Sequence, residues 1–212
     1  MSSRPGDHPP RLRRPLTERS LAPPAGPYNS WDRNPYIFTT GDDATPTSVP
    51  ITSEVRRNFL FCSYGGIKGI DHDDGSGWYH DSYNYMPYCS GKMKGQSQTL
   101  SGNVYLFPLW GTQCVHMMGG MDPGGEPMMY YNNTCVARNS DIYTSCSEDS
   151  TTGNGQVLAN NTYFVAGGLK GFPCASTWPA WQAAGEDVGS TITDELPSVD
   201  TMVGWGRELL GF

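Results

Sequence analysis

The feature that most constrains the fold of this 212-residue chain is a loose internal repeat, in which an asparagine precedes a short run of aromatic and aliphatic residues. The copies begin at Asn34 (NPYIF), Asn58 (NFLFC), Asn84 (NYMPY), Asn103 (NVYLF), Asn132 or Asn133 (NNTCVA) and Asn160 or Asn161 (NNTYFVA). Successive copies are separated by 24, 26, 19, 29 and 28 residues. A period in this range indicates a solenoid, and the short alternating runs indicate strands rather than paired helices.

A parallel β-helix accounts for these runs, because each coil adds short strands that pair with the coils above and below at a spacing of about 4.8 Å. Equivalent asparagines then stack in a buried column, where each side-chain amide both donates and accepts. The predicted fold is therefore all-β, a short parallel β-helix of about six coils. The alternative is an antiparallel sandwich, in which asparagine marks the turns because it tolerates left-handed backbone.

Two segments near the C-terminus, TWPAWQAAGEDVG and PSVDTMVGWGRELLGF, have helical spacing. In the second, Ser198 is the predicted N-cap, Asp200 lies in the first turn, Arg207 lies in the last turn and Gly211 ends the helix. Its apolar residues fall mostly on one face: Val199, Met202, Val203, Leu209 and Leu210. An open solenoid end exposes the core and unpaired strand edges, which a cap would cover. We therefore predict that the segment from about residue 176 to residue 212 forms a C-terminal cap with a capping helix.

Charge divides the chain into two parts. Residues 1–27 hold five arginines against one aspartate and one glutamate, with repeated proline, which predicts a disordered lead-in. Residues 28–212 carry nine basic against nineteen acidic side chains and form the predicted partial β-helix domain. The net charge of −7 argues against a nucleic-acid partner, and no apolar run is long enough to predict a membrane span.

Six cysteines without any CxxC pair favour disulfides and an oxidising compartment. Cys62 and Cys89 lie four and five residues after Asn58 and Asn84, so adjacent coils would bring these two thiols close together as a candidate disulfide. The sequons at positions 132–134 and 160–162 also fit an extracellular protein. The N-terminus has no apolar signal region, so either the signal lies upstream of the given sequence or the chain is not secreted.

The densest chemical cluster is the acidic run DHDD at residues 71–74. In an extended segment Asp71 and Asp73 share one side, whereas His72 and Asp74 share the other. Two carboxylates on one side could bind Ca²⁺, which would bridge an acidic sugar to an acidic protein. The carboxylates could instead act as acid and base in glycoside hydrolysis, with His72 carrying a proton. The structural alternative is a turn in which the aspartates bond backbone amides.

Further candidate residues follow this run. Lys92 and Lys94 share a side if extended, and a lysine with a lowered pKa could act as the base at C5 of a uronate, although solvated surface lysines are the simpler interpretation. The aromatic side chains of Trp78, Tyr79 and Trp110 could stack on sugar rings or could fill the coils. His116 beside two methionines is too small a set to predict a metal site, and no Gly-x-Ser-x-Gly motif indicates a serine esterase.

Three segments together carry a family resemblance: GIDHDDGSGWY at 69–79, WQAAGEDVGST at 181–191 and GWGRELLG at 204–211. With the asparagine coils, they resemble extracellular right-handed β-helix proteins of protists and marine animals, in the pectin-lyase-like superfamily. The resemblance spans about 28–212 and implies the fold more strongly than an activity. Relatives tend to have a Gly-Gly-His-Asp-Ser run where this chain reads GKMKGQSQT at 91–99, which implies loss of activity if those residues are catalytic.

The superfamily includes polysaccharide lyases, polygalacturonases and epimerases, so the resemblance implies a polysaccharide partner. The catalytic residues would be Asp71, His72, Asp73, Asp74, Lys92 and Lys94. Asp71 and Asp73 are also the candidate Ca²⁺ ligands. The alternative function is a glycan-binding or cell-surface adhesion module that does not cut its ligand.

Overall fold

The computed structural model describes residues 52–61, 68–72, 77–94, 96–108, 114–117, 128–138, 142, 156–169 and 177–212. Within these ranges the chain is mostly β, with short strands and two helices. The predicted lead-in at 1–27 lies outside the described residues, as do Asn34, Cys62, Asp73, Asp74 and Trp110.

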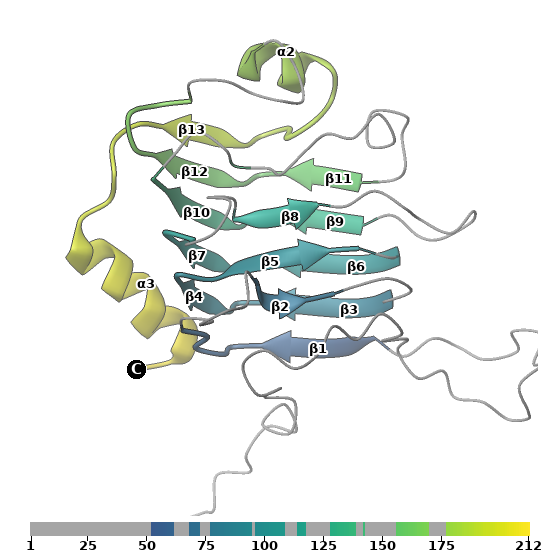
Figure 1. Cartoon of the computed structure of the whole chain (residues 1–212), viewed down its shortest axis with the longest axis vertical. Helices are drawn as coiled ribbons and strands as arrows, with labels where there is room; N and C mark the ends of the chain where they lie inside the picture. Colours follow the sequence, from purple (N-terminus) through teal and green to yellow (C-terminus); the bar gives the residue numbers. More distant parts are fainter. Residues whose placement is uncertain are drawn as a thin grey trace, which may run out of the picture.

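The strands form three stacked sheets, and every strand pair within them is parallel (Figure 1). The first sheet contains β1 (Ser53–Arg56), β3 (Gly77–Ser82), β6 (Gln96–Ser101), β9 (Met128–Tyr131) and β11 (Gln156–Ala159). The second contains β4 (Tyr85–Pro87), β7 (Val104–Leu106), β10 (Thr134–Ala137), β12 (Thr162–Val165) and β13 (Thr191–Thr193). The third contains β2 (Lys68–Asp71), β5 (Ser90–Met93) and β8 (Val115–Met117).

The chain passes from the first sheet to the second and then to the third before it returns, as in the path β3–β4–β5–β6. Each strand therefore pairs with its equivalent one circuit away, and Figure 1 shows the rungs lying above one another. All-parallel pairing excludes the antiparallel sandwich for the described residues. It is compatible with the parallel β-solenoid that the repeat predicted.

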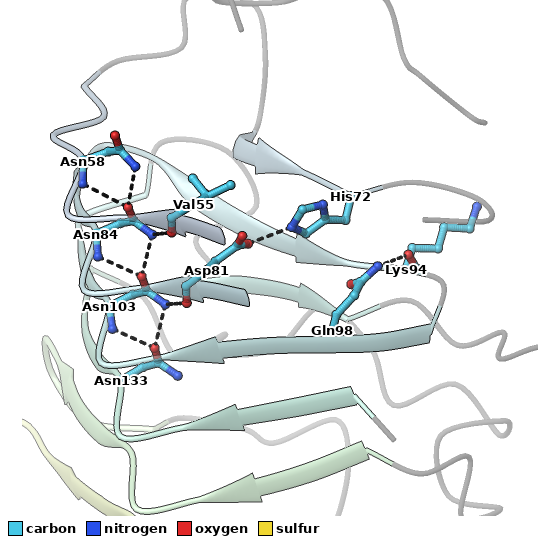
Figure 2. Close-up of polar contacts among 9 residues, drawn as sticks. All are labelled: Val55, Asn58, His72, Asp81, Asn84, Lys94, Gln98, Asn103 and Asn133. Carbon is cyan, nitrogen blue, oxygen red and sulfur yellow. Dashed lines mark hydrogen bonds and ion pairs between the residues drawn. The ribbon is translucent and has the colours of Figure 1, made fainter. Parts of the chain in front are cut away.

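The predicted asparagine ladder is present and runs through the corner between the first and second sheets (Figure 2). In each step the backbone N–H and the side-chain Nδ2 of one asparagine donate to Oδ1 of the next. Between Asn84 and Asn103 these distances are 2.9 and 3.0 Å. The Nδ2 atom of Asn103 also donates to the backbone oxygen of Asp81, at 2.8 Å. Since both amide protons and the amide oxygen are used, the buried side chain leaves no polar atom unpaired.

The structure decides which residue of each asparagine pair belongs to the ladder. Asn133 and Asn161 are buried members, whereas Asn132 and Asn160 precede them with φ of 55° and 53° and are exposed. A positive-φ residue stands just before every ladder position: Arg57, Tyr83, Gly102, Asn132, Asn160 and Gly189. The left-handed residue turns the chain at the corner, and asparagine and glycine adopt that conformation at the least steric cost.

The core lies between the sheets and is built from columns of equivalent residues. On the second sheet Met86, Tyr105, Cys135 and Tyr163 follow one another in register and are almost fully buried. Cys135 forms a disulfide with Cys114, the residue before β8, which links the second sheet to the third across the core. A disulfide is consistent with the expected extracellular location.

The ladder ends on a buried carboxylate that α2 (Trp178–Ala183) helps to cover. Asp187 Oδ1 accepts hydrogen bonds from Asn161 Nδ2 at 3.3 Å, Tyr163 Oη at 3.1 Å and Ser190 Oγ at 2.9 Å. Its Oδ2 accepts from Trp181 Nε1 of α2 at 3.0 Å. The ladder amides all direct their N–H groups toward this end, so their aligned dipoles favour an anion there.

The helix α3 (Val199–Leu210) has the predicted caps but not the predicted place. Ser198 Oγ accepts from Thr201 N at 3.1 Å, and Gly211 ends the helix with φ of 79°. Instead of covering the solenoid end, α3 lies along the outer face of the second sheet (Figure 1). The reason is that this sheet is apolar on both faces: Tyr85, Val104, Leu106 and Val136 pack outward with Met202. α2 takes the position at the end. Neither helix is long and apolar enough to cross a membrane.

Candidate functional site

The third sheet brings three ionisable residues into register on adjacent coils. Asp71 of β2 is the partner of Lys92 of β5, and Lys92 is the partner of His116 of β8. Lys92 Nζ lies 3.0 Å from Asp71 Oδ1, with side-chain exposures of 8% and 35%. Because neighbouring strands are about 4.8 Å apart, the three side chains form one continuous column.

Lys68, at the start of β2, adds a second cation beside this column. Burial lowers the pKa of Lys68 to about 8, while Asp71 raises it and Lys92 lowers it. The amine is therefore partly neutral at mildly alkaline pH. We call Lys68, Asp71, Lys92, Lys94 and His116 the third-sheet cluster.

His116 is held neutral at physiological pH within this cluster. Burial, together with the charges of Lys68 and Lys92, lowers its pKa to about 4 against the opposing effect of Asp71. Lys94 follows the end of β5 and also lowers the pKa of His116, although less than the other two lysines. A neutral imidazole among ammonium groups can accept a hydrogen bond through its unprotonated ring nitrogen.

The structure separates His72 from its neighbour Asp71, as the alternation of an extended chain predicts. His72 is buried, and its Nε2 lies 2.8 Å from Asp81 Oδ2 in the interior (Figure 2). The Tyr79 ring packs on the His72 ring with centroids 4.4 Å apart. His72 therefore lies inside the coils, with the half-buried Tyr79 packed on it, away from the column of Asp71 and Lys92. Their catalytic and sugar-stacking roles stay predictions.

The remaining sequence candidates are only partly described. Trp78 is half-buried in β3. Asp73, Asp74 and Trp110 lie outside the described residues, so calcium binding by Asp71 and Asp73 stays a prediction. Among the residues that the structure describes, no group of three or more His, Cys, Asp or Glu side chains could hold a metal ion.

Of the candidate disulfide, only one partner can be placed. Cys89 is buried, with Sγ 3.6 Å from the Leu60 carbonyl oxygen, and Cys62 is outside the described residues. The pairing stays a prediction. The disulfide between Cys114 and Cys135 was not singled out from the sequence.

The sequence pattern did not predict that Lys68 and His116 lie near Lys92. The signal that could have found His116 is its distance of 24 residues from Lys92, which is close to the repeat length. In a parallel stack, residues one coil apart become neighbours, so the repeat length is also a contact rule.

Comparisons of this chain with models of protein families, with curated proteins and with solved structures found no match. The likeness to the pectin-lyase-like superfamily therefore rests on the sequence segments and is compatible with the parallel stacked sheets.

Proposed function

We propose that the chain is a secreted right-handed parallel β-helix of the pectin-lyase-like kind, which binds a carboxylate-bearing polysaccharide along its third sheet. The observation that carries the proposal is the column of Asp71, Lys92 and His116 with Lys68 beside it. Successive rungs present cationic or hydrogen-bonding groups along the stack. A linear polyanion is a ligand that can follow such a column.

The third-sheet cluster provides local positive charge on a chain that is acidic overall. A chain of net charge −7 repels polyanions at long range, so binding needs a local concentration of positive charge. The charges of Lys68, Lys92 and Lys94 all lower the pKa of His116, which supports a local concentration of positive charge near this imidazole. The ammonium of Lys92 already binds a carboxylate, that of Asp71, so the site has the geometry for that type of ligand.

The test is calorimetric titration of the folded protein with polyuronates and with a neutral glycan of similar length. Lys68→Gln and Lys92→Gln should each weaken polyuronate binding by about 10- to 100-fold, since a hydrogen bond to a charged group contributes roughly 1.5–3 kcal/mol. Arg207→Gln on α3 is the control for charge, because it removes one positive charge on the outer side of the second sheet. Equal effects of all three substitutions, or no binding by the unmodified chain, would rule the proposal out.

A second candidate function, polysaccharide lysis, is favoured by the lowered pKa of Lys68. A lyase needs a base that takes the proton from C5 of a uronate while a cation stabilises the carboxylate. Lys68 in its neutral form could take that proton while Lys92 pairs with the carboxylate. The electrons of the C5–H bond then form the C4–C5 double bond, and the leaving oxygen at C4 departs with the bonding pair and a proton from water.

Ultraviolet absorbance of the C4–C5 double bond distinguishes lysis from binding alone. Product from the unmodified chain that disappears in Lys68→Gln would support the lyase. Binding without product would leave the non-catalytic glycan-binding or adhesion module. The same assays with and without Ca²⁺, on the chain and on Asp73→Asn, test whether a cation bridges the sugar to the predicted acidic site.

A further inference from the structure

A serine and a histidine meet on the outer face of the first sheet, away from the third-sheet cluster. His80 Nε2 of β3 lies 2.8 Å from Ser101 Oγ of β6. The two residues are 21 positions apart in sequence and belong to adjacent coils. A hydroxyl within hydrogen-bond reach of an imidazole is the pairing that activates a serine nucleophile.

The alternation of the first sheet places this pair outside the core. Tyr79 and Asp81 are on the inner side of β3, where Asp81 is buried beside His72, so His80 points to the opposite side. Leu100 of β6 is fully buried in the core, so its neighbour Ser101 faces outward. Ser101 retains 6% of its surface exposed, and His80 is half-buried. The pair is thus largely shielded from water, but it is not part of the core.

Aromatic residues and an acidic residue flank the pair of His80 and Ser101. Tyr131 of β9 is the register partner of Ser101 on the next coil. The Tyr83 ring covers Gly102, where an added Cβ would lie 2.8 Å from the ring, so both sides of Ser101 carry an aromatic residue. Glu54 of β1 is the register partner of His80, and its carboxylate contacts Arg56 Nε at 3.1 Å. One rung of about 4.8 Å thus separates the histidine from an acid that could orient it.

The geometry points to Ser101 as a nucleophile for acyl esters, with His80 as its general base. In the tautomer protonated at Nδ1, His80 Nε2 accepts the Ser101 proton as Oγ attacks the ester carbonyl. The ester C–O bond then breaks, and His80 returns the proton to the departing alkoxide. Water, deprotonated by His80, attacks the acyl-serine, and collapse of the second intermediate releases the carboxylic acid and restores the Ser101 hydroxyl.

This inference does not depend on the proposed polysaccharide binding. It uses a different sheet and shares no residue with the third-sheet cluster. The sequence lacks the Gly-x-Ser-x-Gly motif of serine esterases, which requires a strand-to-helix turn. Here the pair is assembled from two parallel strands by their register, so a local motif is not needed.

Labelling of the full chain by a fluorophosphonate, with the modified residue located by peptide mass spectrometry, tests the nucleophile. We expect modification at Ser101, none in Ser101→Ala, and a rate lower by about 100-fold or more in His80→Gln. Glutamine keeps a hydrogen-bonding side chain beside Ser101 but cannot act as a base at neutral pH. Circular dichroism and the melting temperature establish that each variant is folded.

Ser82→Ala is the matched control, because Ser82 is the register partner of Ser101, is similarly buried and lies on the same face. Its labelling rate should equal that of the unmodified chain. Absence of labelling at Ser101, preferential labelling of Ser82, or an unchanged rate in folded His80→Gln would each overturn the inference. Hydrolysis of a chromogenic acetyl ester should follow the same order among the variants, and turnover that persists in Ser101→Ala would overturn it as well.

Discussion

The Lys92 ammonium lies 3.0 Å from the Asp71 carboxylate, which belongs to the preceding strand of the third sheet. Asp71 is about one-third exposed, whereas Lys92 is almost buried. The pair therefore holds a nearly buried cation beside a carboxylate that the solvent can reach. A ligand carboxylate that approaches Lys92 competes with Asp71 for the same ammonium group.

Asp71→Asn should consequently strengthen polyuronate binding several-fold, because it removes the competing carboxylate and one negative charge. It should also destabilise the fold, by about 1–3 kcal/mol, because it removes a carboxylate from beside the nearly buried Lys92 ammonium. Calorimetric titration and denaturant unfolding measure the two effects. If Asp71 instead acts as a catalytic acid or a calcium ligand, the same substitution would abolish turnover or calcium-dependent binding.

The pH dependence of binding should follow Lys68. Its pKa of about 8 means that the ammonium loses its proton between about pH 7 and 9, so affinity for a polyuronate should fall across that interval. Lys68→Arg keeps the charge at all these pH values and should remove the decline. A titration curve that is the same in the two proteins would contradict the assignment to Lys68.

The same shift predicts how Lys68 affects stability. The folded pKa of about 8 lies below the ordinary lysine value of 10.5, so the unfolded chain binds more protons between these pH values. The free energy of unfolding should therefore increase as pH rises from about 8 to 10.5. The same contribution is lost as pH falls again through 8. Comparison with Lys68→Met by chemical denaturation isolates this contribution from that of other lysines.

Breaking one rung of the asparagine ladder should destabilise the solenoid strongly. The Asn103 side-chain amide donates hydrogen bonds to Asn133 Oδ1 and to the Asp81 carbonyl oxygen. In Asn103→Asp both amide protons are lost, so a carboxylate oxygen would face these two acceptors. We expect a loss of about 3 kcal/mol or more in the free energy of unfolding, as for a buried charge facing acceptors.

Asn132→Asp makes the same chemical change one residue before a ladder position. Asn132 is exposed and left-handed, a conformation that aspartate tolerates, so the change should stay within about 0.5 kcal/mol. Urea unfolding of both variants provides the comparison, and similar losses would show that the ladder contributes little.

Two glycines of α3 should respond oppositely to alanine. A Cβ at Gly206 would lie 2.9–3.1 Å from the Tyr85 ring, whereas one at Gly204 would meet nothing within 4 Å. Gly204→Ala should stabilise by about 0.5–1 kcal/mol through helix propensity. Gly206→Ala should destabilise the fold, because the helix or the Tyr85 ring must move to make room for the Cβ. That movement would weaken the hydrogen bond that Tyr85 Oη donates to the Met202 carbonyl oxygen at 3.0 Å.

Thermal unfolding of the two glycine variants measures the difference. Stabilisation of similar size in both would show that α3 is not packed against Tyr85. A loss in Gly206→Ala that is reversed by Tyr85→Leu would locate the clash at that ring.

The repeat and the ends of α3 could be predicted because both are local. Asn58, Asn84 and Asn103 each stand before a run of strand residues, and Ser198 and Gly211 bracket a helical pattern. Those signals need only neighbouring residues and the known geometry of strands and helix caps. The asparagine ladder followed from the recurrence itself, since equivalent residues of a parallel stack must become neighbours.

The partners across coils depended on register, which the uneven repeat leaves open. Ladder neighbours are separated by 26, 19, 30 and 28 residues, so no constant offset relates one coil to the next. For this reason the contact of Lys92 with Asp71, 21 residues before it, and the pairing of His80 with Ser101 were not apparent from the sequence.

The sequence alone therefore determined the kind of fold, through a periodic pattern of buried asparagines and apolar strands. The tertiary structure decided the side of the second sheet on which α3 packs, the disulfide between Cys114 and Cys135, and the residues that share a site. The physical reason is that burial of apolar side chains and of the hydrogen-bonded asparagine favours the same residue pattern in every coil. The contacts between coils depend on loop lengths and on a register that only the assembled stack defines.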